Sequence, residues 1–81
     1  MAKLYSRQLR DLQAEIGRAV RKYPKFNSAH EGWAVLREEV DELWDEVKKS
    51  PKNRRSARMY KEAIQVAAVA IRFAAEAVKG E

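Results

Sequence analysis

Residues 31–47, EGWAVLREEVDELWDEV, decide the fold because their apolar side chains recur at the spacing of one helix face. Seven of these seventeen residues are acidic and only one is basic. At about 100° per residue, Glu39 falls between Val35 and Leu43, inside the apolar face, and Glu42 falls at its edge. The stretch therefore predicts an amphipathic helix that places carboxylates against a hydrophobic core.

The whole chain predicts three helices, and no stretch shows the alternation typical of strands. The helices are expected over residues 3–22, 28–49 and 56 to 78 or 79. Ser28 followed by Glu31 fits a capping box at the start of the second helix. Pro24 and Pro51 separate the helices. We expect one all-α domain spanning residues 1–81.

The last predicted helix lacks a polar face. Residues 63–78 are apolar on almost every side and include seven alanines. A helix that is apolar all round is buried all round, and two neighbouring helices cannot cover it. We therefore expect a homo-oligomer, a dimer or a tetramer, in which the three-helix chains form a larger helical bundle.

Composition excludes several classes of site. The chain has no cysteine, which excludes disulfides and thiolate zinc sites, and its one histidine, His30, cannot form a histidine cluster. Residues 63–78 are too short to span a bilayer, and the N-terminal residues do not read as a signal peptide. The sequence therefore predicts a soluble, cytoplasmic protein without a membrane partner. The net charge of +5 favours nucleic acid only weakly, because acids dominate the middle of the chain.

The third predicted helix also carries an acidic residue on its apolar face. Glu62 lies on the apolar face that includes Phe73, and Gln65 lies beside it. Several unpaired carboxylates in an apolar face repel one another and cost several kcal/mol each. The balancing charge is either an arginine, such as Arg58 or Arg72, or a hard cation such as Mg²⁺ or Mn²⁺. The alternative is a solvated acidic helix with ordinary ion pairs.

Two motifs on successive helices resemble a known family. REEVDEL at residues 37–43, followed by KEAIQVAAVAIRF at residues 61–73, resembles the MazG-like all-α nucleoside triphosphate pyrophosphohydrolases. That family is marked by EExxE on one helix and ExxD on the next. The resemblance covers residues 4–78 and implies a MazG-like helical bundle.

The resemblance assigns roles residue by residue. Glu38, Glu39 and Glu42 match EExxE, and Glu62 matches the first position of ExxD. Gln65 stands where the family has aspartate, so a neutral amide replaces one anionic ligand. The resemblance implies that Glu39, Glu42 and Glu62 bind Mg²⁺ or Mn²⁺, with Gln65 contributing its carbonyl oxygen. Glu38 is then an outer ligand or the base that positions water.

The implied reaction converts a nucleoside triphosphate and water into a nucleoside monophosphate and pyrophosphate. Basic residues expected near the phosphates are Arg58, Lys61, Arg72 and residues 52–55. Neither the base nor the sugar preference follows from the sequence.

Two alternatives remain open at this point. The first is a catalytically degenerate MazG-like protein that binds nucleotide or serves as an oligomeric scaffold, because Gln65 replaces the aspartate and larger relatives continue into a further helix. The second is a small basic helical module that binds nucleic acid through residues 48–61, with strong salt dependence and no need of a divalent ion. We consider nucleic acid the less favoured partner, since this reading leaves the carboxylates in two apolar faces unexplained.

Overall fold

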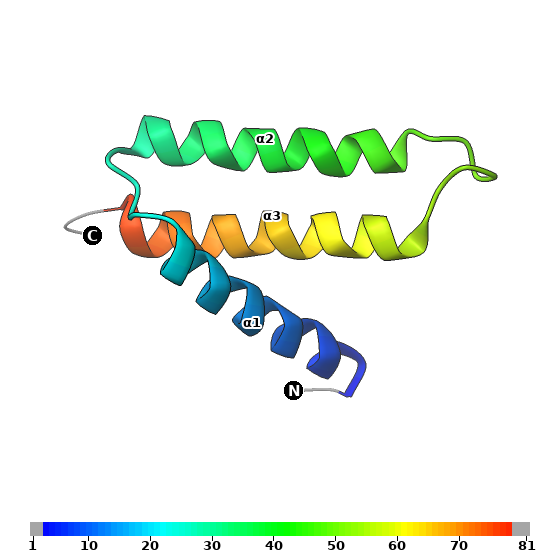
Figure 1. Cartoon of the computed structure of the whole chain (residues 1–81), viewed down its shortest axis with the longest axis horizontal. Coiled ribbons are helices and arrows are strands. Elements are labelled where there is room, and N and C mark those ends of the chain that lie inside the picture. The colour runs from blue at the N-terminus through cyan, green and yellow to red at the C-terminus, as the bar shows by residue number, and fades with distance from the viewer. Residues whose placement is uncertain (1–2, 79–81) are drawn as a thin grey trace.

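A computed structural model describes residues 3–78 as three α-helices preceded by one short helical turn (Figure 1). The elements are a 3-10 turn at Lys3–Tyr5, α1 at Ser6–Lys22, α2 at Ala29–Val47 and α3 at Ser56–Glu76. The described residues contain no strand, so the all-α prediction is confirmed. Each helix ends within three residues of its predicted limit, and the alternative helix end at Lys79 lies outside the described residues.

The third helix is the centre of the arrangement. Figure 1 shows α2 and α3 side by side and antiparallel, with α1 crossing α3 obliquely. Both α1 and α2 pack on α3, whereas within residues 3–78 the backbones of α1 and α2 do not approach each other. The third helix is therefore the surface on which both other helices pack.

A capping interaction fixes the start of α2. Ser28 Oγ accepts a hydrogen bond from the Glu31 amide at 3.1 Å, as the capping box predicts. The Glu31 carboxylate returns to the amide of Asn27, at 2.7 Å, and not to that of Ser28. The predicted cap at Ser28 is therefore confirmed. The second hydrogen bond of the capping box comes from the amide of Asn27, one residue before Ser28.

A buried ion pair ties the connection between α1 and α2 to the end of α3. Arg72 is only 5% exposed and donates to the Glu76 carboxylate through Nε at 2.9 Å and Nη2 at 3.0 Å. The same Nη2 donates to the Pro24 carbonyl oxygen at 3.1 Å. Glu76 Oε1 also accepts from the Phe26 amide at 3.1 Å, and the guanidinium lies 4.6 Å from the centre of the Phe26 ring. These contacts hold the loop where it turns from one helix to the next.

The first helix has its own polar contact with α3. Tyr60 donates its hydroxyl hydrogen to Asp11 Oδ2 over 2.6 Å. The Arg7 guanidinium lies 4.5 Å from the centre of the Tyr60 ring. The tyrosine therefore joins the N-terminal ends of α1 and α3.

None of the helices in residues 3–78 is long and apolar enough to cross a membrane.

Replacing Gly32 and Gly17 with alanine is expected to change the free energy of unfolding in opposite directions. A Cβ on Gly32 would lie 2.7 Å from Phe73 Cδ2 and 3.2 Å from Phe26 Cδ2, so α2 approaches these rings because residue 32 has no side chain. The better helix propensity of alanine is outweighed by overpacking, and we expect Gly32→Ala to lower the free energy of unfolding by about 1 kcal/mol. A Cβ on Gly17 would meet only Arg21 Nη1 at 3.4 Å. Gly17→Ala should therefore raise stability by up to about 1 kcal/mol.

Urea unfolding of the two alanine variants, followed by circular dichroism at one protein concentration, checks this prediction. Equal effects of the two substitutions would contradict the close approach of Gly32 to the rings.

Candidate metal centre

Three glutamates converge between α2 and α3. Glu39 and Glu42 come from α2 and Glu62 comes from α3, and one carboxylate oxygen of each lies within 4.8 Å of the other two. The antiparallel packing of the two helices produces this meeting, because it sets the middle of α2 beside the first half of α3. Within residues 3–78, none of these three carboxylates forms an ion pair with lysine or arginine.

Gln65 lies against two of the three carboxylates. When its amide nitrogen is turned toward them, it donates to Glu39 Oε2 over 3.2 Å and to Glu62 Oε2 over 3.3 Å. In the opposite orientation its carbonyl oxygen faces the same two carboxylates. The first orientation suits a site without a cation, and the second presents a fourth oxygen to one.

Two carboxylates of this cluster have raised pKa values. Burial, followed by the charges of Glu42 and Glu62, raises the pKa of Glu39 to about 7. Burial and then the charge of Glu42 also raise the pKa of Glu62. Glu39 and Glu62 thus resist ionisation beside the neighbouring carboxylates, which is the condition that a divalent cation relieves.

This shift predicts how the metal-free protein responds to pH. Glu39 has its ordinary pKa of 4.5 when unfolded and a pKa of about 7 when folded, so between these values the folded state holds a proton that the unfolded state has lost. The stability associated with protonated Glu39 is therefore complete below pH 4.5 and is lost as the pH rises through about 7. In EDTA, we expect the melting temperature to fall as the pH rises from about 5 to 8.

Thermal unfolding of the wild type and of Glu39→Gln across that pH range measures the effect. The variant should show a smaller decline, and parallel curves for the two proteins would contradict the assignment.

The other predicted site residues occupy different surroundings. Glu38 is exposed on α2, beside Glu39, and raises the pKa of that neighbour through its charge. Arg58 and Lys61 are exposed in the first two turns of α3. Arg72 is buried and gives its guanidinium to the loop between α1 and α2, so its predicted contact with phosphate stays a prediction and its observed contacts are structural.

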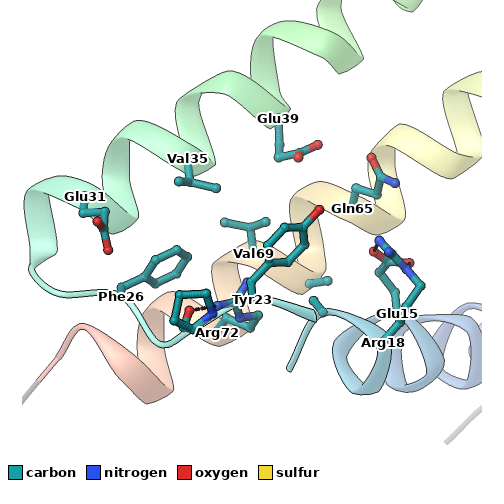
Figure 2. Close-up of a pocket in the computed structure, with 13 residues that line it drawn as sticks. Glu15, Arg18, Tyr23, Phe26, Glu31, Val35, Glu39, Gln65, Val69 and Arg72 are labelled. Atoms are coloured by element: carbon teal, nitrogen blue, oxygen red, sulfur yellow. Dashed lines mark hydrogen bonds and ion pairs between the residues drawn. The ribbon is translucent and has the colours of Figure 1, made fainter. Parts of the chain in front are cut away.

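A cavity of about 510 Å³ adjoins the carboxylates, between all three helices (Figure 2). Glu39 and Gln65 belong both to its wall and to the acidic cluster. The other residues of the wall are Glu15, Arg18, Ala19, Tyr23, Pro24, Phe26, Glu31, Val35, Ala68, Val69 and Arg72. The cavity therefore combines an aromatic and aliphatic lining with charged groups, and it shares Glu39 and Gln65 with the candidate cation site.

Sequence reasoning missed most of this wall. The sequence pattern assigned no site role to Tyr23, Phe26 or Arg18. Arg18 donates from Nε to Glu15 at 3.1 Å, and this pair faces the cavity from α1 (Figure 2). The available signal was weak: two aromatic residues flank a proline immediately before the acidic helix.

The donor set fits a hard divalent cation. Three carboxylates and one amide oxygen are oxygen ligands, which Mg²⁺ and Mn²⁺ prefer, and within residues 3–78 none of the three carboxylates forms an ion pair with lysine or arginine. Comparisons with models of protein families, with curated proteins and with solved structures found no match to this chain.

Proposed function

We propose that the chain is a divalent-cation-dependent nucleoside triphosphate pyrophosphohydrolase of the MazG-like type. The observation that carries the proposal is the convergence of Glu39, Glu42 and Glu62 without a basic partner among the described residues, at the edge of a cavity of about 510 Å³. A solvated acidic helix does not account for Glu39 and Glu62, which are both half-buried. The sequence resemblance to the EExxE and ExxD motifs supports the same reading.

Each residue of the cluster has a defined task in this proposal. Glu39, Glu42 and Glu62 would hold Mg²⁺ or Mn²⁺, and Gln65 would turn its carbonyl oxygen toward the cation. When bound, such a cation supplies positive charge against the phosphates and acidifies water. Exposed Glu38 would orient the attacking water and accept its proton.

The overall reaction balances without a further reactant. The water oxygen forms a bond to the α-phosphorus while the bond from that phosphorus to the bridging oxygen breaks. Pyrophosphate leaves, and the nucleoside monophosphate keeps the new oxygen. Arg58 and Lys61, both exposed at the start of α3, are the available cations for the departing phosphates.

The cavity provides the place for the nucleoside. Glu39 and Gln65 line one part of its wall, so a ligand with phosphates at the carboxylates would direct its base toward Tyr23 and Phe26. Aromatic rings stack on any base, which leaves the choice of base open. We propose that the active form is a homo-oligomer.

Pyrophosphate release tests the proposal. Purified protein is incubated with a panel of ribo- and deoxyribonucleoside triphosphates in Mg²⁺, in Mn²⁺ and in EDTA. We expect release that needs a divalent ion and falls at least 100-fold in Glu39→Ala, because the cluster loses a ligand. Asp41→Ala, on the exposed side of the same helix, is the control and should keep the activity. Absence of release by folded protein would overturn the proposal.

Gln65 favours one second candidate, a protein that binds nucleoside triphosphate and cation without hydrolysis. A neutral amide leaves the cluster with one charge fewer than an ExxD motif would give it. This candidate predicts cation-dependent nucleotide binding by calorimetry without pyrophosphate release. It also predicts that Gln65→Asp creates the missing turnover.

A further inference from the structure

The basic residues of the chain are concentrated in two segments. Residues 3–10 and 48–61 together contain ten of the seventeen lysines and arginines and none of the twelve acidic residues. The rest of the chain therefore carries seven basic and twelve acidic side chains, so it is net negative although the whole protein has a charge of +5. Charges that are separated in this way produce a strong positive potential at one place, whereas evenly mixed charges would cancel.

The fold brings the two basic segments together. Figure 1 shows that the start of α1, the loop between α2 and α3 and the start of α3 lie toward the same end of the molecule. The hydrogen bond from Tyr60 to Asp11, over 2.6 Å, fastens α1 to α3 there. The Arg7 guanidinium lies over the Tyr60 ring, and Lys61 lines a groove of about 330 Å³ together with Tyr60 and Asp11. One long-range contact thus joins segments that lie far apart in the sequence.

Most of the basic side chains at this end have no acidic partner. Three of the ten form ion pairs within residues 3–78, each with an acid three or four residues away. Arg54 donates to the Val47 carbonyl oxygen from Nε at 3.1 Å and from Nη2 at 2.8 Å. The other six are exposed and form no ion pair within the described chain; they are Lys3, Arg10, Lys52, Arg55, Arg58 and Lys61. We refer to these six residues as the basic end.

An exposed aromatic ring accompanies these charges. Tyr5 lies between Lys3 and Arg7 in the sequence, and it is 54% exposed. It is the N-cap residue of α1, but its side chain forms no capping hydrogen bond, so the ring is not needed to start the helix. Aromatic rings beside basic groups are typical of surfaces that bind single strands, because bases stack on the rings while phosphates meet the cations.

The side chains at this end favour nucleic acid over a lipid surface. Basic surfaces that bind membranes gain affinity from large apolar side chains that enter the lipid. Residues 48–61 supply most of the charge and expose no large hydrophobic side chain. Five of the ten basic residues are arginines, whose planar guanidinium pairs with phosphate in two hydrogen bonds and stacks on aromatic faces. This chemistry fits a strand of phosphates and bases.

We propose that the basic end binds single-stranded nucleic acid, with the phosphates of the strand at its six cations and a base stacked on Tyr5. The start of α1 and the loop before α3 act as one surface, and the strand reaches from one to the other. This surface exists beside the candidate metal centre and does not replace it, because Glu39, Glu42 and Glu62 are not part of it. Strand binding needs neither a divalent cation nor pyrophosphate release, so it can hold or fail independently of the proposed activity.

Salt dependence gives the first test. The probe is a fluorescent oligothymidylate of about 20 nucleotides, titrated with the full chain in EDTA and followed by anisotropy. Each phosphate contact on a single strand contributes about −0.7 to the slope of log K against log salt concentration, so six contacts predict a slope of about −4. Absence of binding at low salt, or a slope near zero, would overturn the proposal.

Matched charge variants locate the surface. Arg10→Gln/Arg55→Gln removes one cation from each basic segment, and it should weaken binding at least 10-fold at low salt and reduce the slope to about −3. Arg21→Gln/Lys25→Gln removes the same net charge from exposed positions at the other end of α1 and in the loop that follows. This control should keep the wild-type slope. Equal losses in the two double variants would show that net charge alone attracts the strand, which would refute the basic end.

The stacking contact and the kind of partner are tested by a third comparison. Tyr5→Leu should weaken oligothymidylate binding at least 5-fold without changing the slope, whereas Tyr5→Phe keeps the ring and should bind like the wild type. Sedimentation with phosphatidylcholine vesicles that contain about 30% phosphatidylserine, in the same salt, should leave the protein in solution. Wild-type affinity in Tyr5→Leu would refute the stacked base, and binding to the vesicles without binding to the oligonucleotide would assign the surface to lipid instead.

Discussion

Replacing Glu39 with glutamine is expected to stabilise the protein in EDTA and to abolish its stabilisation by Mg²⁺. At pH 8 the wild-type carboxylate is ionised beside Glu42 and Glu62, and burial together with their charges raises its pKa to about 7. The amide removes one of three repelling charges, which should raise stability by about 1 kcal/mol once solvent screening of this partly exposed group is allowed for. That gain corresponds to a rise of about 4–8 °C in melting temperature for a domain of this size.

The same change removes a charged ligand, so Mg²⁺ should no longer raise the melting temperature. In the wild type, a cation that binds only the folded state adds stability as its concentration exceeds the dissociation constant. Scanning calorimetry of both proteins at one chain concentration, in EDTA and in increasing Mg²⁺, separates the two effects. Asp41→Asn removes a charge from the exposed side of α2 and controls for net charge. A Mg²⁺ response in Glu39→Gln equal to that of the wild type would place the cation elsewhere.

Replacing Arg72 with alanine is expected to cost about 3 kcal/mol, because removing one member of a buried ion pair leaves the other without compensation. The Arg72 and Glu76 side chains are 5% and 10% exposed, and the arginine also satisfies the Pro24 carbonyl. The alanine variant would thus leave the Glu76 carboxylate and the Pro24 carbonyl oxygen without their arginine donor, and it would remove the cation from the Phe26 ring.

An exposed pair of the same kind provides the matched control. Arg37 and Asp41 have the same spacing of four residues, but their side chains are 63% and 61% exposed. Arg37→Ala should therefore change the free energy of unfolding by less than about 1 kcal/mol. Chemical unfolding of both variants decides the matter, and similar losses would show that burial does not strengthen the Arg72–Glu76 pair.

The buried pair also makes the stability of the protein depend on pH in the acid range. The Arg72 hydrogen bonds, together with the Phe26 amide, lower the pKa of Glu76 below its ordinary value. The stability from this pair is therefore complete above about pH 4.5, where the unfolded carboxyl is already ionised, and it is lost as the pH falls through the folded pKa. Glu39 has the opposite dependence in a higher range, so the metal-free protein should be most stable between the two.

The helices were predictable because their signals are local. Ser28 and Glu31 mark a start within four residues, and Pro24 and Pro51 interrupt the chain in ways that no distant contact reverses. The long-range contacts were not predictable in the same way. The hydrogen bond from Tyr60 to Asp11 spans 49 residues, and its existence depends on the angle at which α1 crosses α3, which helical periodicity leaves undetermined.

The acidic cluster was also predictable from local signals, whereas the cavity was not. Glu39 and Glu62 could be predicted as site residues because each carboxylate falls on the face where its helix places apolar residues. An acidic residue on an apolar face is itself an indication of a site. Their convergence then needs only that two successive helices pack against each other. The cavity wall draws on Arg18 and Tyr23 at the end of α1, and nothing in the spacing of these residues relates them to Glu39.

The dependence of α1 on α3 alone has a consequence for the order in which the molecule opens. Because α1 does not pack on α2, its backbone amides can become exposed to hydrogen exchange while the α2–α3 hairpin stays intact. A ligand in the cavity would contact α1 and α2 together and so connect two helices that are otherwise joined through a third. Occupancy of the cavity would thereby slow exchange along α1, and the least anchored helix would become the part of the chain that reports whether the cavity is filled.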